Sequence, residues 1–96
     1  DLWLHARGSR GAHVIVRLNK REECPPETLL DAATLAAHFS ESKDDAVVDV
    51  QFTPRRNVRK PRGSAPGLVL VSGESVIALR MQPERIARLR RSERER

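Results

Sequence analysis

The sequence is poor in cysteine and has no tyrosine. Because Cys24 is the only cysteine, an intramolecular disulfide and a zinc site of paired cysteines are both excluded, and this is typical of the reducing cytoplasm. No apolar run approaches the roughly 20 residues of a membrane-spanning helix, so no membrane partner is expected. The chain starts without a methionine, in a segment predicted as a strand, and we expect it to be a piece of a longer protein.

Aromatic residues are also scarce, since Trp3, Phe39 and Phe52 are the only ones. RNA-binding sheets that stack a row of bases need more aromatic side chains than this, so that mode of recognition is disfavoured. Trp3 is the one candidate for stacking on a base, although a tryptophan more often lies in the core. Recognition of the backbone and shape of a folded RNA fits the composition better.

Catalytic motifs are missing as well. The segment 7–11 (RGSRG) has two glycines but lacks the Lys-Ser/Thr ending of a nucleotide-binding P-loop, and it does not open a helix. No general base and no oxyanion-binding group can be identified beside any serine, so a catalytic triad is not indicated. We therefore expect no enzyme, no cofactor and no small-molecule substrate.

Charge is unevenly distributed along the chain. Residues 27–50 carry six acids and one lysine, residues 51–62 carry five cations and no acid, and residues 83–96 carry six arginines and three glutamates. Segregation of this kind indicates a basic face for a polyanion rather than a uniformly solvated surface.

The alternation of residues 1–6 and 12–18 predicts a β-hairpin closed by the loop 7–11. The favoured register sets His5 opposite His13 and Trp3 opposite Ile15, because a slip of one residue would mix apolar and polar faces. The apolar face then holds Leu2, Leu4, Ala6, Ala12, Val14 and Val16, and the other face holds Asp1, Trp3, His5, His13, Ile15 and Arg17.

The rest of the chain predicts the element order ββαβββα, an α+β fold with a small antiparallel or mixed sheet. A helix with Pro26 in its first turn is expected to bury Leu29, Leu30, Ala33, Ala36 and Ala37 and to expose Glu27, Asp31, Thr34 and His38. Residues 46–53 read as a strand, residues 67–71 and 75–81 as a second hairpin, and Pro83 starts a short basic helix anchored by Ile86 and Leu89. We expect one domain over residues 1–89 and a frayed basic tail over residues 90–96.

The shared face of the first hairpin suggests a motif face of Asp1, Trp3, His5, His13 and Arg17. Two histidines beside an aspartate could bind a metal, but a third or fourth ligand cannot be named and HExxH is absent, so no metal site is predicted. We expect the two histidines to be structural or to contact a bound molecule, and the pattern does not decide between these roles.

The segment 55–67 (RRNVRKPRGSAPG) is the strongest candidate for binding. Its five cations would repel one another in a compact element and need water or an anion, and arginine favours bidentate contact with phosphate. The glycines and prolines hold the segment in extended and turn conformations. We predict RNA contacts from Arg55, Arg56, Arg59, Lys60 and Arg62, weaker contributions from Arg7 and Arg10 in the first turn, and a shaping role for Pro61, Gly63, Pro66 and Gly67.

Two segments, DLWLHARGSRGAHVIVR and VRKPRGSAPGLVLV, together resemble the NFACT-R domain, the predicted RNA-binding C-terminal module of NFACT proteins. That family includes bacterial RqcH, fibronectin-binding-protein-A-like proteins and the eukaryotic nuclear export mediator factor. The resemblance covers about residues 1–80. Its first motif falls on Asp1, Trp3, His5 and His13, and its second on Val58, Lys60, Pro61, Gly63, Pro66 and Gly67.

The resemblance implies a role in ribosome-associated quality control. Family members bind a stalled large ribosomal subunit that still carries peptidyl-tRNA and recruit tRNA for the addition of a C-terminal tail. The implied partners are tRNA or large-subunit rRNA, the large subunit itself, and the other domains of the parent NFACT protein. The chain departs from the family pattern at Arg10-Gly11-Ala12, where Pro-Gly-Ser often precedes the second histidine, and at Phe39 and Phe52, where tyrosine is common.

The sequence is compatible with three other functions. The sheet face could dock another domain of the parent protein, the basic face could bind DNA or anionic membrane without selectivity, or Asp1, His5 and His13 could form a small metal enzyme. RNA or ribosome binding ranks first, and protein docking is the main alternative.

Overall fold

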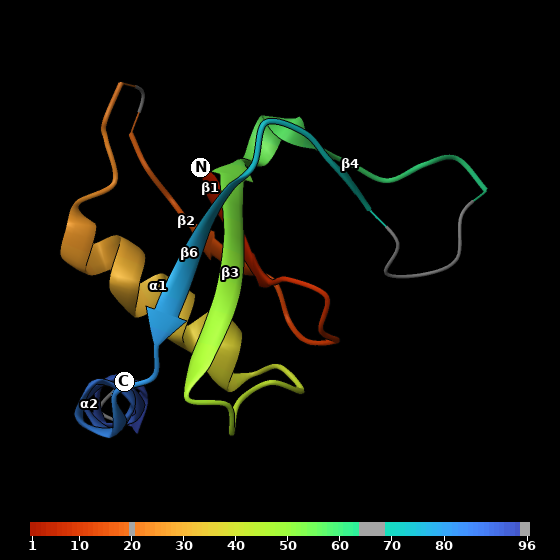
Figure 1. The fold of residues 1–96 in the computed structure, drawn as a ribbon. Helices are drawn as coiled ribbons and strands as arrows, with labels where there is room; N and C mark the ends of the chain where they lie inside the picture. Colours follow the sequence, from red (N-terminus) through yellow and green to blue (C-terminus); the bar gives the residue numbers. More distant parts are fainter. Residues whose placement is uncertain (20, 64–68, 95–96) are drawn as a thin grey trace.

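The computed structural model describes residues 1–19, 21–63 and 69–94 and confirms the α+β class. Figure 1 shows a small sheet with a helix across its back and a narrow extension that reaches away from the body. The elements in chain order are β1 (Leu2–Ala6), β2 (Val14–Val16), α1 (Pro26–His38), β3 (Val47–Pro54), the 3₁₀ turn η1 (Arg55–Asn57), β4 (Val58–Arg59), β5 (Leu70–Val71), β6 (Ser75–Arg80) and α2 (Pro83–Arg94).

The main sheet is antiparallel throughout and has the strand order β2-β1-β3-β6. The predicted register of the first hairpin is confirmed, because Trp3 pairs with Ile15 and Leu4 with Val14. Strand β2 is shorter than predicted, however, and Ala12 is exposed rather than part of the apolar face. The preceding segment turns instead toward the end of α1, where Gly11 forms a β-bridge with Ser40.

One face of the main sheet packs against α1 and forms the core. Alternate residues of β1, β3 and β6 point to this face, as the period of two requires. The predicted helix stripe is confirmed at Ala33, Ala36 and Ala37, which are fully buried. The fully buried residues of the sheet on this face are Leu4, Ala6 and Val50.

The opposite stripe of α1 was predicted to be exposed, and this holds at Glu27 but was wrong at Asp31, Thr34 and His38. Thr34 is 1% exposed, and its hydroxyl donates to the Leu30 carbonyl at 2.7 Å.

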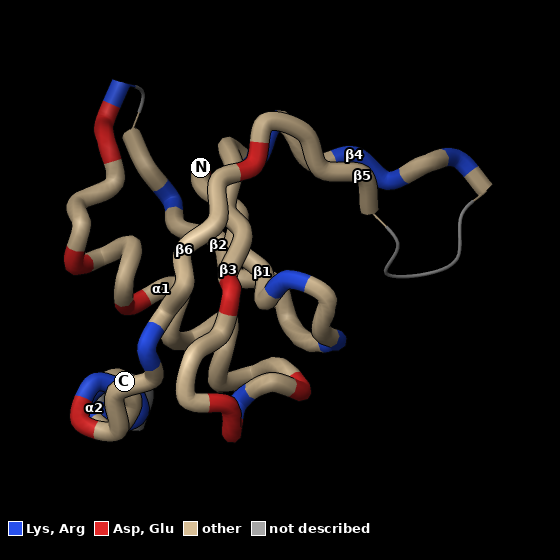
Figure 2. The backbone as a smooth tube through the Cα atoms, viewed as in Figure 1, with Lys and Arg blue, Asp and Glu red and all other residues tan. Residues whose placement is uncertain are grey.

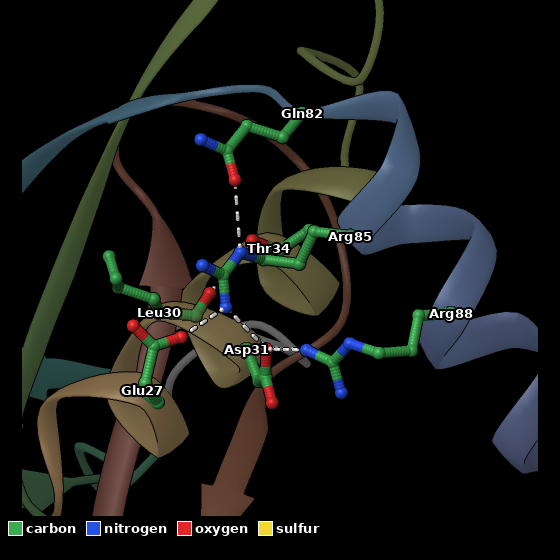
Figure 3. A network of polar contacts seen from close by, with 7 residues as sticks. All are labelled: Glu27, Leu30, Asp31, Thr34, Gln82, Arg85 and Arg88. Carbon is green, nitrogen blue, oxygen red and sulfur yellow. Dashed lines mark hydrogen bonds and ion pairs between the residues drawn. The ribbon is translucent and has the colours of Figure 1, made fainter.

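Helix α2 packs beside this stripe, and Figure 3 shows its Arg85 reaching across to Glu27 and Asp31. The Arg85 Nη1 atom lies 3.0 Å from Glu27 Oε2 and 2.7 Å from Asp31 Oδ1, and Arg88 Nη2 lies 2.5 Å from the same Asp31 oxygen. His38, at the end of the stripe, is half-buried for the same reason.

The predicted second hairpin was also wrong. Strand β5 pairs with β4 in a separate two-stranded sheet, whereas β6 pairs with β3 in the main sheet. The junction is held by Thr53, whose hydroxyl donates to the Ser72 carbonyl at 2.9 Å and accepts from Asn57 Nδ2 at 3.2 Å. Gly73 then turns the chain with a φ of 61°, a left-handed conformation that suits glycine. These contacts direct β5 away from β6, so the two strands never meet as a ladder.

Helix α2 begins at Pro83 as predicted and continues to Arg94, so residues 90–94 of the expected tail are helical. Pro83 is suited to this first turn because its nitrogen needs no hydrogen-bond acceptor there. Among the described residues, the structure has no helix long and apolar enough to cross a membrane.

Candidate nucleic-acid interface

Three rings cluster on the face of the sheet that α1 does not cover. Trp3 stacks on His5 with ring centroids 5.7 Å apart and an interplanar angle of 18°. His13 meets Trp3 edge-on at 5.2 Å, and it lies 5.2 Å from His5. The alternation of β1 places Trp3 and His5 on the same side, and the hairpin register brings His13 back to them. The predicted motif face is therefore assembled at its centre.

Trp3 belongs to the folded interior and not to the surface. Its side chain is 2% exposed, and its Nε1–H donates to His13 Nδ1 at 2.5 Å. This buried position leaves no open face of the indole for a base. His13 is exposed, and it is the ring that the cluster presents to solvent.

The position of His5 favours a neutral imidazole. Burial lowers the pKa of His5 below its usual 6.5, and repulsion between the two imidazolium ions when His13 is also protonated lowers it further, while a hydrogen bond with the Gly11 backbone opposes the shift. The causes are physical, since an imidazolium loses hydration when it is buried and repels a second one. His5 therefore contributes a neutral ring to the cluster at neutral pH.

The outer members of the predicted motif face lie apart from the rings. The Asp1 carboxylate accepts from the Leu18 N–H at 3.2 Å, which ties the start of β1 to the end of the hairpin. Arg17 is exposed. Within the described part of the chain, no group of three His, Cys, Asp or Glu side chains is close enough to hold a metal ion.

The segment with five cations is more regular than predicted. Arg55 and Arg56 lie on η1, Arg59 lies on β4, and Lys60 and Arg62 follow the strand. All five are exposed, and none of them forms an ion pair with an acid in residues 1–19, 21–63 or 69–94. Figure 2 shows β4 and β5 extending away from the body with Lys and Arg colour on them, apart from the Asp and Glu colour on α1.

The residues predicted to shape this segment are described in part. Gly63 has a φ of 74°, so the chain turns there in a conformation that disfavours other side chains. Pro61 is half-buried. Pro66 and Gly67 lie outside the described residues.

The turn after β1 supplies a second set of cations. Arg7 and Arg10 are exposed, and Gly8 has a φ of 68°. Figure 2 shows Lys and Arg colour both on this turn and on the β4–β5 extension. A hollow lies between the two segments. It is lined by the three rings and, among others, by Arg10, Glu41, Gln51, Val69 and Val71.

Comparison with known proteins now assigns the family. Residues 1–78 match the family model described as the NFACT protein RNA binding domain. The chain belongs to the NFACT RNA-binding domain family. The predicted resemblance is thus confirmed, and the matched region contains the ring cluster and the five cations.

Relatives support the same assignment over more of the chain. The Rqc2 homolog RqcH of Bacillus subtilis is 35% identical over 92 residues, which cover 96% of this chain and 16% of that protein. The coiled-coil domain-containing protein 25 homolog of Dictyostelium discoideum is 33% identical over 78 residues, covering 77% of this chain and 38% of that protein. The solved C-terminal part of the fibronectin/fibrinogen-binding protein of Streptococcus suis superposes with a TM-score of 0.78 at 31% identity, over 91% of this chain and 34% of that one. The present chain therefore spans about a sixth of the RqcH protein that it matches.

Several residues that line this hollow of the NFACT RNA-binding domain were missed from the sequence, among them Gln51, Glu41 and Val69. Gln51 pairs with His5 across β1 and β3, and the alternation of residues 46–53 was enough to place it on the ring side. Glu41 and Val69 reach the hollow from loops, where no periodic signal marks them. Glu41 is brought there by its N–H, which donates to the Arg10 carbonyl at 2.9 Å.

Proposed function

We propose that this NFACT RNA-binding domain binds folded RNA mainly through its phosphates. The cations Arg55, Arg56, Arg59, Lys60 and Arg62 would supply most of the binding energy, and Arg7 and Arg10 would add to it from the other side of the hollow. The observation that carries the proposal is the exposure of all five cations without an acidic partner in the described chain. Such cations release counterions when they meet phosphates, and this release favours binding.

We also propose a place for this binding in ribosome-associated quality control, because the relatives that align over nearly the whole chain are RqcH proteins. In this proposal the domain contacts tRNA or large-subunit rRNA on a stalled large subunit and supports C-terminal tailing. The other domains of the parent protein supply the remaining contacts, and the domain works in the cytoplasm without catalysis of its own. Phosphate contacts position a protein on RNA, so they suit a module that works beside other domains.

The test is the salt dependence of RNA binding by a charge variant. In this variant Arg55, Arg56, Arg59, Lys60 and Arg62 are all replaced by Gln. Five phosphate contacts predict a log–log slope of about −3.5 to −4.5 for the parent chain, measured by fluorescence anisotropy with labelled tRNA. The variant should bind weakly and lose most of that slope.

A matched control removes the same charge elsewhere. Its five changes to Gln are all at exposed positions away from the predicted contacts, at Arg21, Lys43, Arg80, Arg90 and Arg91. This control should keep most of the slope. An unchanged slope in the first variant would exclude the five cations, and absence of RNA binding by the parent chain would favour the alternative, docking onto other domains of the parent protein.

A further inference from the structure

A second groove lies beside the ring cluster, between the edge strand β2 and the base of the β4–β5 extension. It has a volume of about 350 Å³. Its lining consists of apolar and ring side chains with two cations and no acid, namely Trp3, His13, Ile15, Arg55, Val58, Lys60 and Val69. Ile15 is 42% exposed, so its side chain is accessible to a molecule in this groove.

The composition of this groove points to a ligand with two different parts. Ile15, Val58 and Val69 offer an apolar surface, which a phosphate alone would not use. Arg55 and Lys60 offer positive charge at the same groove, which an uncharged apolar ligand would not use. A nucleotide combines a flat, weakly polar base with a phosphate, and its chemistry matches both parts.

The hydrogen bond between Trp3 and His13 determines what His13 offers to such a ligand. An indole N–H is a donor only, so His13 Nδ1 must carry no proton when it accepts this bond. The proton of the neutral imidazole is then on Nε2. Because Trp3 is buried and His13 is exposed, the groove presents the His13 ring with an N–H donor and no open indole face.

Only an unpaired base can enter a groove of this kind. In an RNA duplex the faces of the bases are stacked on one another, and proteins reach mainly phosphates and 2′-hydroxyls. We propose that the groove binds one unpaired nucleotide of the RNA, with its base against Ile15 and His13 and its phosphate at Arg55 and Lys60. This rests on the proposed RNA binding and adds a preference for single-stranded positions.

The test compares unpaired and duplex RNA of equal length on the 96-residue chain. Trp3 is the only tryptophan and its indole donates to His13, so its fluorescence reports on the surroundings of the His13 ring. Ile15→Ala removes apolar surface, and His13→Gln removes the ring while its amide oxygen can still accept from Trp3. Each variant should lose about tenfold in affinity for an unpaired RNA of eight nucleotides, the size of one lost base contact, and keep its affinity for duplex RNA and its salt slope.

Val76→Ala is the matched control, because Val76 is 41% exposed on the same side of the sheet and does not line the groove. It should change neither affinity, and circular dichroism should show the same fold for all three variants. Equal losses on unpaired and duplex RNA, or no loss, would overturn the groove proposal. A parent chain that binds both RNAs equally with the full salt slope would overturn it while leaving phosphate binding intact, whereas a parent chain without RNA binding would overturn both.

Discussion

At the scale of single residues, His5 and His13 are two histidines of one hairpin that differ in their surroundings. The sequence predicted that the two rings face each other, and the register of β1 and β2 confirms it. The sequence did not decide between a structural and a contacting role. The structure separates the two residues, since His5 is half-buried beneath Trp3 and His13 is exposed.

The lowered pKa of His5 predicts a pH dependence of stability. Since the folded value is below the unfolded value of about 6.5, the unfolded chain takes up this proton first as the pH falls. The contribution of His5 to the free energy of unfolding is therefore complete above pH 6.5 and decreases as the pH falls below that value. Urea denaturation at pH 7.5 and pH 5.5 should show a smaller loss of stability in His5→Gln than in the parent chain. Equal losses in both would contradict the assignment.

At the scale of elements, the sequence predicted the helices and strands correctly where apolar residues recur with a regular period. It failed where burial or strand pairing depends on contacts between distant segments. The alternation of β1 and β3 and the alanine stripe of α1 are local patterns, and each element formed as expected. Thr34 and Asp31 were predicted to be exposed because they lie on the side of the helix opposite its apolar stripe, but α2 packs on that side. Strand β5 pairs with β4 because of hydrogen bonds at Thr53 and Asn57, which no sequence period reveals.

Gly11 makes an element-scale prediction. A Cβ atom there would lie 2.7 Å from the Phe39 carbonyl oxygen and 2.8 Å from Ser40 Cα, both of which are backbone atoms with little freedom to move. Gly11→Ala should therefore push the first turn off the end of α1 and lower the free energy of unfolding by about 1–3 kcal/mol. Gly8→Asn is the control, because a Cβ at Gly8 meets nothing within 4 Å and Asn tolerates its positive φ. Equal stability of Gly11→Ala and the parent in urea would show that the contact is dispensable.

At the scale of the whole molecule, the two basic segments differ in their ion pairing. The sequence predicted that the segment 55–67 is the main binding segment, and it assigned no contact to the arginines of residues 83–96. Arg85 and Arg88 of α2 form ion pairs with acids of α1, so part of the positive charge of residues 83–96 is neutralised within the domain. The five cations of 55–62 have no such acidic partner in the described chain, and their charge is available to a polyanion.

The pairing of α1 with α2 predicts a local effect of one substitution. Asp31 receives both arginines and its side chain is 26% exposed, so Asp31→Asn should loosen α2 and leave the main sheet in place. Hydrogen exchange should become faster over residues 83–94 and stay unchanged in β1 and β3. Asp49→Asn, a matched change at an exposed position on β3, should alter neither region. Unchanged exchange of α2 in Asp31→Asn would show that its apolar contacts suffice.

The most direct test of the central claim is the choice of polyanion by the parent chain. Fluorescence anisotropy with labelled tRNA and with a DNA duplex of matched length, from roughly 50 to 200 mM salt, measures affinity and slope together. We expect tighter binding to tRNA, with a slope that corresponds to about four or five phosphate contacts. Equal binding to both nucleic acids would contradict it and leave only a basic surface without selectivity.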